Sequence, residues 1–339
     1  MDVMTKAEVK NVIDGTVTGD ERIPLLYDLW IYPDQFEDQP DKLKKLLSAV
    51  PKDVKDFFVT LPSFAGAIPS YRPPENRKAY DSVVIIKDWE GEGEELFDNF
   101  PEFDSKTLAA EGPFDDSRYL LGRWWYCYFE RLWSLRGMEN ALMDFYLYPD
   151  EVHTLFRKLT DLYCSVLEGV KKQTGADGIF VSDDIGTQTG PFFSLDIFRE
   201  FFKPYYKELI EKAHSLDMHF WLHSCGNIEL FMEDFIEIGL DVIHPIQKRT
   251  MDEAVIAERY GDRICILAGF EVQEIIPFGT PEEVRKEVQR LISVYKNPSG
   301  RFMLTMGNGT TPDWKYDSIE ALYEESLKEV NAQKLQYKL

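Results

Sequence analysis

The 339-residue chain has little cysteine, few basic residues and no long apolar runs. Its four cysteines are too few and too irregularly spaced for a disulfide framework, so we expect a reducing compartment, the cytoplasm. There are 38 lysines and arginines against 60 aspartates and glutamates, a formal net charge of −22, which argues against nucleic acid or an anionic membrane as partner. No apolar run approaches the roughly 18 residues of a membrane-spanning helix. The N-terminus has no apolar segment of signal-peptide length, so we expect no membrane association.

What the chain does have is a regular alternation of short apolar runs with longer segments of helical period. This alternation indicates βαβ units and a parallel sheet. Eight such units favour a closed (β/α)₈ barrel, with residues 1–339 as one domain, over an open doubly wound sheet. The eight predicted strands begin at Ile23, Phe57, Tyr119, Gly178, His219, Asp241, Ile264 and Phe302.

Residues 63–117 interrupt this alternation. The segment is rich in proline, glycine and acids, and residues 81–93 have the pattern of a β-hairpin. An insertion after a barrel strand lies at the C-terminal face, where active sites of barrels form. We therefore expect it to cover the site.

Four helices have clear signals. Ser194 is a good N-cap for a helix ending at Leu216, and Asn227 caps one ending at Ile238. Thr280 is followed by a proline at the first helical position and two glutamates, and residues 317–333 close the chain with a last helix.

Metal-ligand side chains follow two neighbouring predicted strands. His223 and Cys225 are two positions apart, so on a strand both side chains point to one face. An imidazole with a thiolate is a pair typical of zinc sites. His244 ends the next strand, close enough to converge on the same ion. The alternative is a core histidine beside a buried free cysteine.

Acidic residues also stand at strand ends. Asp183 and Asp184 follow an apolar strand directly, and we expect one of them, preferably Asp184, to have a catalytic role. Glu271 follows another strand and is a candidate for a general acid, a residue that orients a ligand, or a loop cap. His153 and His214 have helical, charged surroundings, and His219 begins its strand, at the end away from chemistry.

Aromatic residues are dense near the first and third predicted strand ends. Tyr27, Trp30, Tyr126 and Tyr128 are the predicted walls of a pocket for a planar ligand. Gln247 and Asn308, at two further strand ends, are the predicted polar contacts to substrate. The alternative is that the aromatic residues belong to the core.

Several motifs, in this order and spacing, resemble the uroporphyrinogen decarboxylase superfamily. They are Ser182-Asp-Asp-Ile-Gly-Thr-Gln-Thr-Gly-Pro, Phe198-Arg-Glu-Phe-Phe-Lys-Pro-Tyr-Tyr-Lys, His223-Ser-Cys-Gly-Asn, Gly239-Leu-Asp-Val-Ile-His-Pro-Ile-Gln, and Gly279-Thr-Pro-Glu-Glu-Val followed by Met306-Gly-Asn-Gly. The resemblance covers residues 177–339 well and the N-terminal half loosely. It implies a (β/α)₈ barrel.

The superfamily divides into cofactor-free porphyrinogen decarboxylases and zinc methyltransferases that work with a corrinoid protein. The decarboxylases carry an Arg-Gln-Ala-Gly-Arg motif after the first strand, where this chain has Tyr27-Asp-Leu-Trp-Ile-Tyr-Pro-Asp-Gln. The methyltransferase branch and the related methionine synthases bind zinc through His-x-Cys, which matches His223 and Cys225. The place of a further ligand resembles His244. The last ligand, a cysteine, is here Asn308, which argues against a thiol-methylating role.

The resemblance therefore implies a methyltransferase similar to the O-demethylases. We expect methyl transfer from a small, methoxylated, aromatic donor to the Co(I) of a corrinoid protein, with zinc on His223, Cys225 and His244. Three alternatives stay open: a methylcorrinoid:thiol methyltransferase, a porphyrinogen decarboxylase, and a non-catalytic protein that binds a tetrapyrrole or corrinoid.

Overall fold

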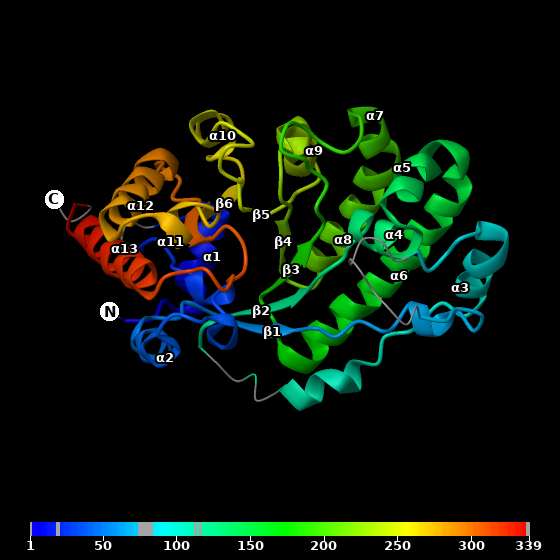
Figure 1. Ribbon diagram of the computed structural model, residues 1–339, viewed down its shortest axis with the longest axis horizontal. Helices are drawn as coiled ribbons and strands as arrows, with labels where there is room; N and C mark the ends of the chain where they lie inside the picture. The colour runs from blue at the N-terminus through cyan, green and yellow to red at the C-terminus, as the bar shows by residue number, and fades with distance from the viewer. Residues whose placement is uncertain (1, 18–20, 74–83, 112–113, 115–116, 337–339) are drawn as a thin grey trace.

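The barrel sheet is seen directly in a computed structural model that describes residues 2–17, 21–73, 84–111, 114 and 117–336. Seven parallel strands pair in chain order and curl into a sheet surrounded by helices (Figure 1). The strands are β1 (Val54–Phe58), β2 (Tyr119–Trp124), β3 (Gly178–Ser182), β4 (His219–His223), β5 (Val242–His244), β6 (Cys265–Phe270) and β7 (Phe302–Met306).

The eighth position of the barrel is held by a single bridge. Leu25 pairs in parallel with Leu304, and the Leu26 N–H donates to the Leu304 carbonyl at 2.8 Å. The expected strand at Ile23 is therefore reduced to this bridge. One reason is that Pro24 has no N–H to donate; another is that the Leu25 N–H donates to the Asp53 carboxylate at 2.9 Å instead of to β1. The architecture is the predicted (β/α)₈ barrel.

Helices follow the strands and cover the outside of the sheet (Figure 1). They are α1 (Lys6–Asp14), α2 (Pro40–Ala49), α3 (Glu94–Asp98), α4 (Phe129–Arg136), α5 (Met138–Leu147), α6 (Pro149–Thr174), α7 (Leu195–Ile197), α8 (Lys203–Ser215), α9 (Met232–Glu237), α10 (Glu253–Tyr260), α11 (Ile275–Phe278), α12 (Pro281–Tyr295) and α13 (Tyr316–Gln336). Among the helices described, none has the length and apolarity needed to cross a membrane.

Of the predicted helices, α12 begins where expected, whereas those predicted at Ser194 and Asn227 differ from the structure. Thr280 caps α12 with a full capping box, as its sequence signal predicts. The single helix expected for Ser194–Leu216 is instead α7, a π-helix over Phe198–Phe202, and α8. The helix expected from Asn227 begins two residues later as a 3₁₀ turn, Glu229–Phe231, because the Asn227 side chain accepts the Glu229 N–H at 3.1 Å.

The inserted segment is not the expected hairpin. Residues 84–88 are irregular and Trp89–Gly93 is a π-helix; residues 81–83 lie outside the described part. The carbonyls of Ile86 and Lys87 accept from the Arg136 guanidinium, and the Ile86 N–H donates to Leu135, so these groups bond to α4 and not to a partner strand. Further along, Ser105–Glu111 forms a 3₁₀ helix against α6.

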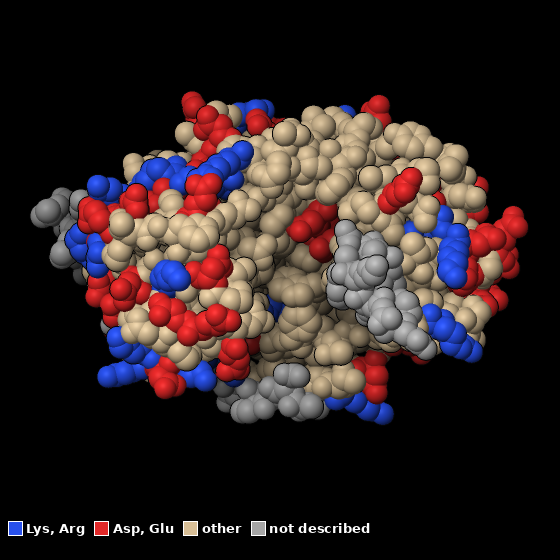
Figure 2. Space-filling view, in the orientation of Figure 1, with Lys and Arg blue, Asp and Glu red and all other residues tan. Residues whose placement is uncertain are grey.

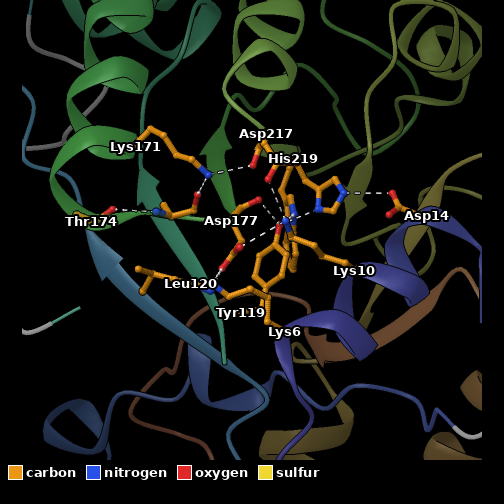
Figure 3. Close-up of polar contacts among 12 residues, drawn as sticks. Lys6, Lys10, Asp14, Tyr119, Leu120, Lys171, Thr174, Asp177, Asp217 and His219 are labelled. Carbon is orange, nitrogen blue, oxygen red and sulfur yellow. Dashed lines mark hydrogen bonds and ion pairs between the residues drawn. The ribbon is translucent and has the colours of Figure 1, made fainter. Parts of the chain in front are cut away.

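The amino ends of the strands are closed by α1, whose buried side chains are Val9, Val12 and Ile13. Polar contacts fix this closure at the base of the barrel (Figure 3). The Asp177 carboxylate accepts the Leu120 N–H at 3.0 Å and pairs with Lys6 at 2.9 Å. His219, the first residue of β4, also lies at this base, where its ring contacts the Tyr119 hydroxyl at 3.0 Å and Asp14 at 3.2 Å.

Charged side chains gather mainly around the periphery of the molecule. Figure 2 shows this distribution on one face, together with a hollow near the middle that is bordered mostly by uncharged residues and has acidic atoms on one wall.

Candidate metal centre

Three potential metal ligands lie together at the carboxyl ends of β3 and β4. The ligand atoms of Asp184, His223 and Cys225 all lie within 4.8 Å of one another. His223 Nε2 is 3.4 Å from Cys225 Sγ and 3.5 Å from Asp184 Oδ1. His223 is buried, while the Asp184 side chain is 39% exposed, so the cluster can be reached from outside.

Close contact between two loops sets this geometry. Gly226 has φ +82°, and a Cβ there would lie 2.3 Å from the Gly186 carbonyl carbon, so only glycine lets the loop after β4 approach the loop after β3. The Cys225 N–H donates to Asp184 Oδ1 at 2.7 Å across the junction. The Gly226 N–H donates to Gln247 at 2.7 Å. These bonds hold the thiol beside the carboxylate.

A second histidine fixes the orientation of the His223 ring. His244 Nε2 is 2.9 Å from the Met306 carbonyl, which can only accept, so this nitrogen carries a proton. In neutral His244, Nδ1 is then an acceptor, and it lies 2.7 Å from His223 Nδ1. His223 therefore donates from Nδ1 and keeps its Nε2 lone pair for Cys225 and Asp184. A metal-binding histidine needs this arrangement.

Burial keeps both rings neutral. It lowers the pKa of His223 and, together with His223 itself, holds the pKa of His244 well below its usual range. Burial, with Asp184 and Glu130, raises the pKa of the Cys225 thiol, and the Asn308 amide, 3.6 Å from Sγ, opposes that shift. A partly buried thiol beside a carboxylate is unfavourable as a bare thiolate. A divalent cation would offset that cost, so the donor set fits zinc.

Residues 131–328 match the model of the family described as uroporphyrinogen decarboxylase (URO-D). The chain belongs to the uroporphyrinogen decarboxylase family. No curated protein sequence matches it.

One solved structure shares the fold at low sequence identity, and two others align with lower TM-scores. A methyltransferase from Methanosarcina mazei has a TM-score of 0.63 and 14% identity, over 97% of this chain and 99% of that one. A xylanase from Gloeophyllum trabeum has a TM-score of 0.48 and 9% identity, over 90% and 96%. An intracellular xylanase from Thermoanaerobacterium saccharolyticum has a TM-score of 0.42 and 13% identity, over 88% and 98%.

His244 was predicted as the third ligand, but it is not grouped with His223, Cys225 and Asp184. It is fully buried, and both of its ring nitrogens are already engaged, with Met306 and with His223. Asp184 instead completes the group with His223 and Cys225. In the described part of the chain, Asp184 is therefore the residue grouped with His223 and Cys225, and His244 lies behind His223, where it orients the ring.

The other predicted acids are structural caps. The Asp183 carboxylate accepts the N–H groups of Tyr128, Phe129 and Glu130 and so caps α4. The Glu271 carboxylate accepts three N–H groups, from residues 273–275, at 2.6–2.9 Å. Both oxygens accept, so the contacts of Glu271 fit the loop cap among its three predicted roles.

The predicted aromatic pocket is only partly present. Tyr27 is buried and its hydroxyl lies 2.8 Å from Ser326 on α13, and the Tyr128 hydroxyl lies 2.9 Å from Thr160 on α6. Both are core residues, contrary to prediction. Trp30 does lie at the site, with its ring 5.2 Å from that of His223. Tyr126 is half-buried and packs on Trp133, 5.7 Å away.

The two polar residues predicted to contact substrate do lie together. Gln247 and Asn308 line one pocket with Cys225 and Glu271, on the side of the site formed by β5, β6 and β7.

Three residues of the site had not been singled out from the sequence. Trp125 stacks on Trp30 at 5.6 Å, and Phe58 at the end of β1 meets Trp125 at 5.8 Å. The alternation of side chains along a strand could have identified Trp125. It follows β2 directly and lies two residues after Arg123, so both side chains are expected on one face. The third, Glu130, bonds to Ser182, and burial together with Asp184 and Asp183 raises its pKa to about 8.

Proposed function

We propose that the protein is a zinc-dependent methyltransferase that takes a methyl group from a small methoxylated aromatic donor and passes it to the Co(I) of a corrinoid protein. The observation that carries this proposal is the cluster of Asp184, His223 and Cys225 at the mouth of a barrel of this family. The Methanosarcina mazei methyltransferase, with the same fold along nearly its whole length, supports the reaction class.

Asp184, His223 and Cys225 would hold the zinc, with His244 keeping the His223 lone pair directed at it. Zinc supplies Lewis-acid chemistry, which here would lower the basicity of the ether oxygen as phenolate leaves. The chain supplies the setting: burial excludes water around His223, and the Asn308 amide donates toward the Cys225 sulfur.

The aromatic surroundings favour a ring-bearing donor. Trp30 and Trp125 stand beside the His223 ring, at 5.2 and 6.5 Å. Burial of one aromatic ring against them would contribute roughly 2–3 kcal/mol. A methyl thiol or methylamine would gain none of this.

The acceptor must come from outside the chain, because a cobalt centre has to reach the methyl carbon. The exposure of Asp184 shows that the cluster opens to the surface. A separate corrinoid protein at the mouth satisfies this requirement.

The test is a methyl-transfer panel with Co(I) cobalamin as acceptor. Donors are 2-methoxyphenol, other methoxyarenes and methanol; a parallel arm offers methylcobalamin with a thiol. We expect methylcobalamin from methoxyarenes only. Methylation of the thiol, without demethylation of any ether, would establish the methylcorrinoid:thiol alternative and overturn the proposal, as would decarboxylation of a porphyrinogen.

A further inference from the structure

We infer that Gln247 and Asn308 form a subsite that presents N–H donors to the oxygen from which the methyl group leaves, and that stabilises the negative charge which develops there. This inference rests on the proposed function and deepens it, because it gives the leaving oxygen a place and a chemistry of its own beside the metal. The two amides and the pocket that they line are called the donor subsite below.

The donor subsite lies beside the Cys225 sulfur. Its pocket is formed by the loops that follow β4, β5, β6 and β7, and it has an empty volume of about 380 Å³, part of which is open solvent. Cys225, Gln247 and Asn308 all line it. An oxygen bound there would be next to one of the proposed metal ligands.

The Gln247 amide is oriented by a backbone N–H. The Gly226 N–H donates to Gln247 Oε1 at 2.7 Å. An N–H group can bond only to the oxygen of an amide, so the oxygen is turned to Gly226 and the NH₂ group is left for the pocket. Among the described residues, none accepts a hydrogen bond from this NH₂ group.

The Asn308 amide is oriented in the same way. The Gly309 N–H donates to Asn308 Oδ1 at 2.7 Å, and Asn308 Nδ2 lies 3.6 Å from Cys225 Sγ. One N–H of the amide is directed at the sulfur, and the other is left for a ligand. Both amides therefore use their oxygens on backbone N–H groups and offer donors to the pocket, which is the arrangement of an oxyanion hole.

The charged residues of the pocket offer a ligand no competing acceptor. The Glu271 carboxylate already accepts the N–H groups of residues 273–275 at 2.6–2.9 Å. The Lys248 ammonium, which also lines the pocket, pairs with Glu287 at 2.7 Å. A ligand oxygen thus meets two fixed donors, whereas a ligand N–H meets no fixed side-chain acceptor.

Close backbone packing holds the turn that carries Asn308. A Cβ on Gly269 would lie 2.6 Å from Gly307 Cα, and a Cβ on Gly307 would lie 2.8 Å from the Phe270 carbonyl oxygen. The Gly307 N–H donates to that carbonyl at 2.9 Å. The amide is therefore in place before a ligand arrives, so little reorganisation is needed when charge develops.

The donors match the charge that the reaction creates. Co(I) supplies the electron pair of the new bond to the methyl carbon, and the pair of the broken C–O bond stays on the oxygen, which becomes a phenolate. N–H groups directed at this oxygen stabilise it more in the transition state than in the neutral ether. A methylammonium donor would place a positive charge against the same N–H groups, so the donor subsite selects an oxygen leaving group over an amine.

The experiment measures the ionisation of a bound phenol without turnover. 2-Naphthol has a single polar atom, and its ionised form is distinguished by absorbance. The full chain is measured with zinc and without it, which separates the effect of the amides from that of the metal. In both states we expect the bound probe to be ionised to a larger extent than the free probe at the same pH.

Isosteric variants test the two amides. Gln247→Glu and Asn308→Asp keep an oxygen for Gly226 and Gly309 but replace the NH₂ group by a second oxygen. Each should lower the ratio of ionised to neutral bound probe about tenfold. Gln273→Glu is the matched control, because Gln273 lines the same pocket and gains the same charge but is not one of the two fixed donors; its ratio should change less than threefold.

Asn308 is exposed, so Asn308→Asp keeps the test valid should Gln247→Glu unfold. Failure of 2-naphthol to bind, an unchanged ratio in both variants, or an equal loss in Gln273→Glu would overturn the donor subsite. If the bound probe behaves as expected and no methyl is transferred, the proposed reaction is wrong and the donor subsite stands. If methyl transfer is equally fast in wild type and both variants, the reaction stands and the donor subsite is wrong.

Discussion

At the scale of single residues, the metal centre depends on the position of one proton. Met306 fixes a proton on His244 Nε2, His244 then accepts from His223 Nδ1, and the lone pair of His223 Nε2 points to Cys225 and Asp184. Under the proposed ligand set, this chain of bonds gives His244 the role of orienting His223.

Replacement of His244 by alanine should therefore weaken zinc binding without abolishing it. The loss of a residue that orients a ligand typically costs about 10–100-fold in metal affinity, whereas His223→Ala should remove binding altogether. Competition with a chromogenic chelator measures both, with the half-exposed His153→Ala as control. If His244→Ala loses as much affinity as His223→Ala, His244 is a ligand and the ligand set is wrong.

Asp183 and Asp184 are adjacent in sequence but have different contacts, so the same substitution at each should give different results. Asp184→Asn should lower zinc affinity and leave the free energy of unfolding nearly unchanged, because its amide oxygen can still accept from Cys225. Asp183→Asn should keep zinc affinity but destabilise the fold by about 2 kcal/mol, since an amide serves fewer of the α4 N–H groups. Urea unfolding and zinc titration of both variants check this, and identical behaviour of the two would contradict it.

The sequence predicted His223 and Cys225 as a pair because strand alternation is local. It could not decide between His244 and Asp184, because the deciding contact is a carbonyl 62 positions away, at Met306. The prediction that Tyr27 and Tyr128 line the pocket was wrong for a similar reason, because the residues they bond to, on α13 and α6, are remote in sequence.

At the scale of elements, the start of α12 was predicted correctly because its capping contacts are local, whereas the hairpin was not, because a distant group competes for its backbone. Thr280 and Glu283 satisfy each other within one turn, so α12 begins where expected. The hairpin failed because Arg136, about 50 residues away, takes the carbonyls that a partner strand would need.

The junction of α8 with β5 should give a pH-dependent stability. The bond from His214 to Asp241, 2.8 Å long, raises the pKa of His214 above 6.5. A histidine whose folded pKa is raised contributes stability that is full below its unfolded pKa and is lost as pH rises through the folded value.

His214→Gln should therefore be less stable than wild type at pH 5, and the difference should shrink above neutral pH. Thermal unfolding from pH 5 to 9 measures the trend, with His153→Gln as the reference. A difference that grows with rising pH would contradict this account.

At the scale of the whole molecule, the candidate metal centre and the helix that closes the barrel, α1, lie at opposite ends of the strands. The carboxyl ends of the strands hold the cluster of Asp184, His223 and Cys225, and the amino ends hold the polar contacts that fix α1 (Figure 3). Eight alternating units predicted this architecture, and the weakly defined first strand still supplies the eighth position through Leu25.

Asp177 is the most important member of those basal contacts. It is buried, accepts the Leu120 N–H and pairs with two lysines of α1, at 2.9 and 3.5 Å. Asp177→Ala should destabilise the protein by about 2 kcal/mol, because it leaves the buried Leu120 N–H without its acceptor, and should keep zinc affinity. Asp217→Asn is the control: its side chain is 87% exposed on the same network and asparagine tolerates the left-handed φ of 53° there, so stability should change by less than about 0.5 kcal/mol. Equal losses in chemical unfolding would show that α1 is not held by Asp177.

The central claim is that one metal ion on Asp184, His223 and Cys225 is required for methyl transfer. The most direct measurement adds zinc stepwise to metal-free protein and follows methylcobalamin formed from a methoxyarene and Co(I) cobalamin. The account predicts a rate that rises with bound zinc, saturates at one ion per chain, and stays at background in Cys225→Ser and His223→Ala. A rate that is the same in metal-free protein, or that survives in both variants, would contradict it.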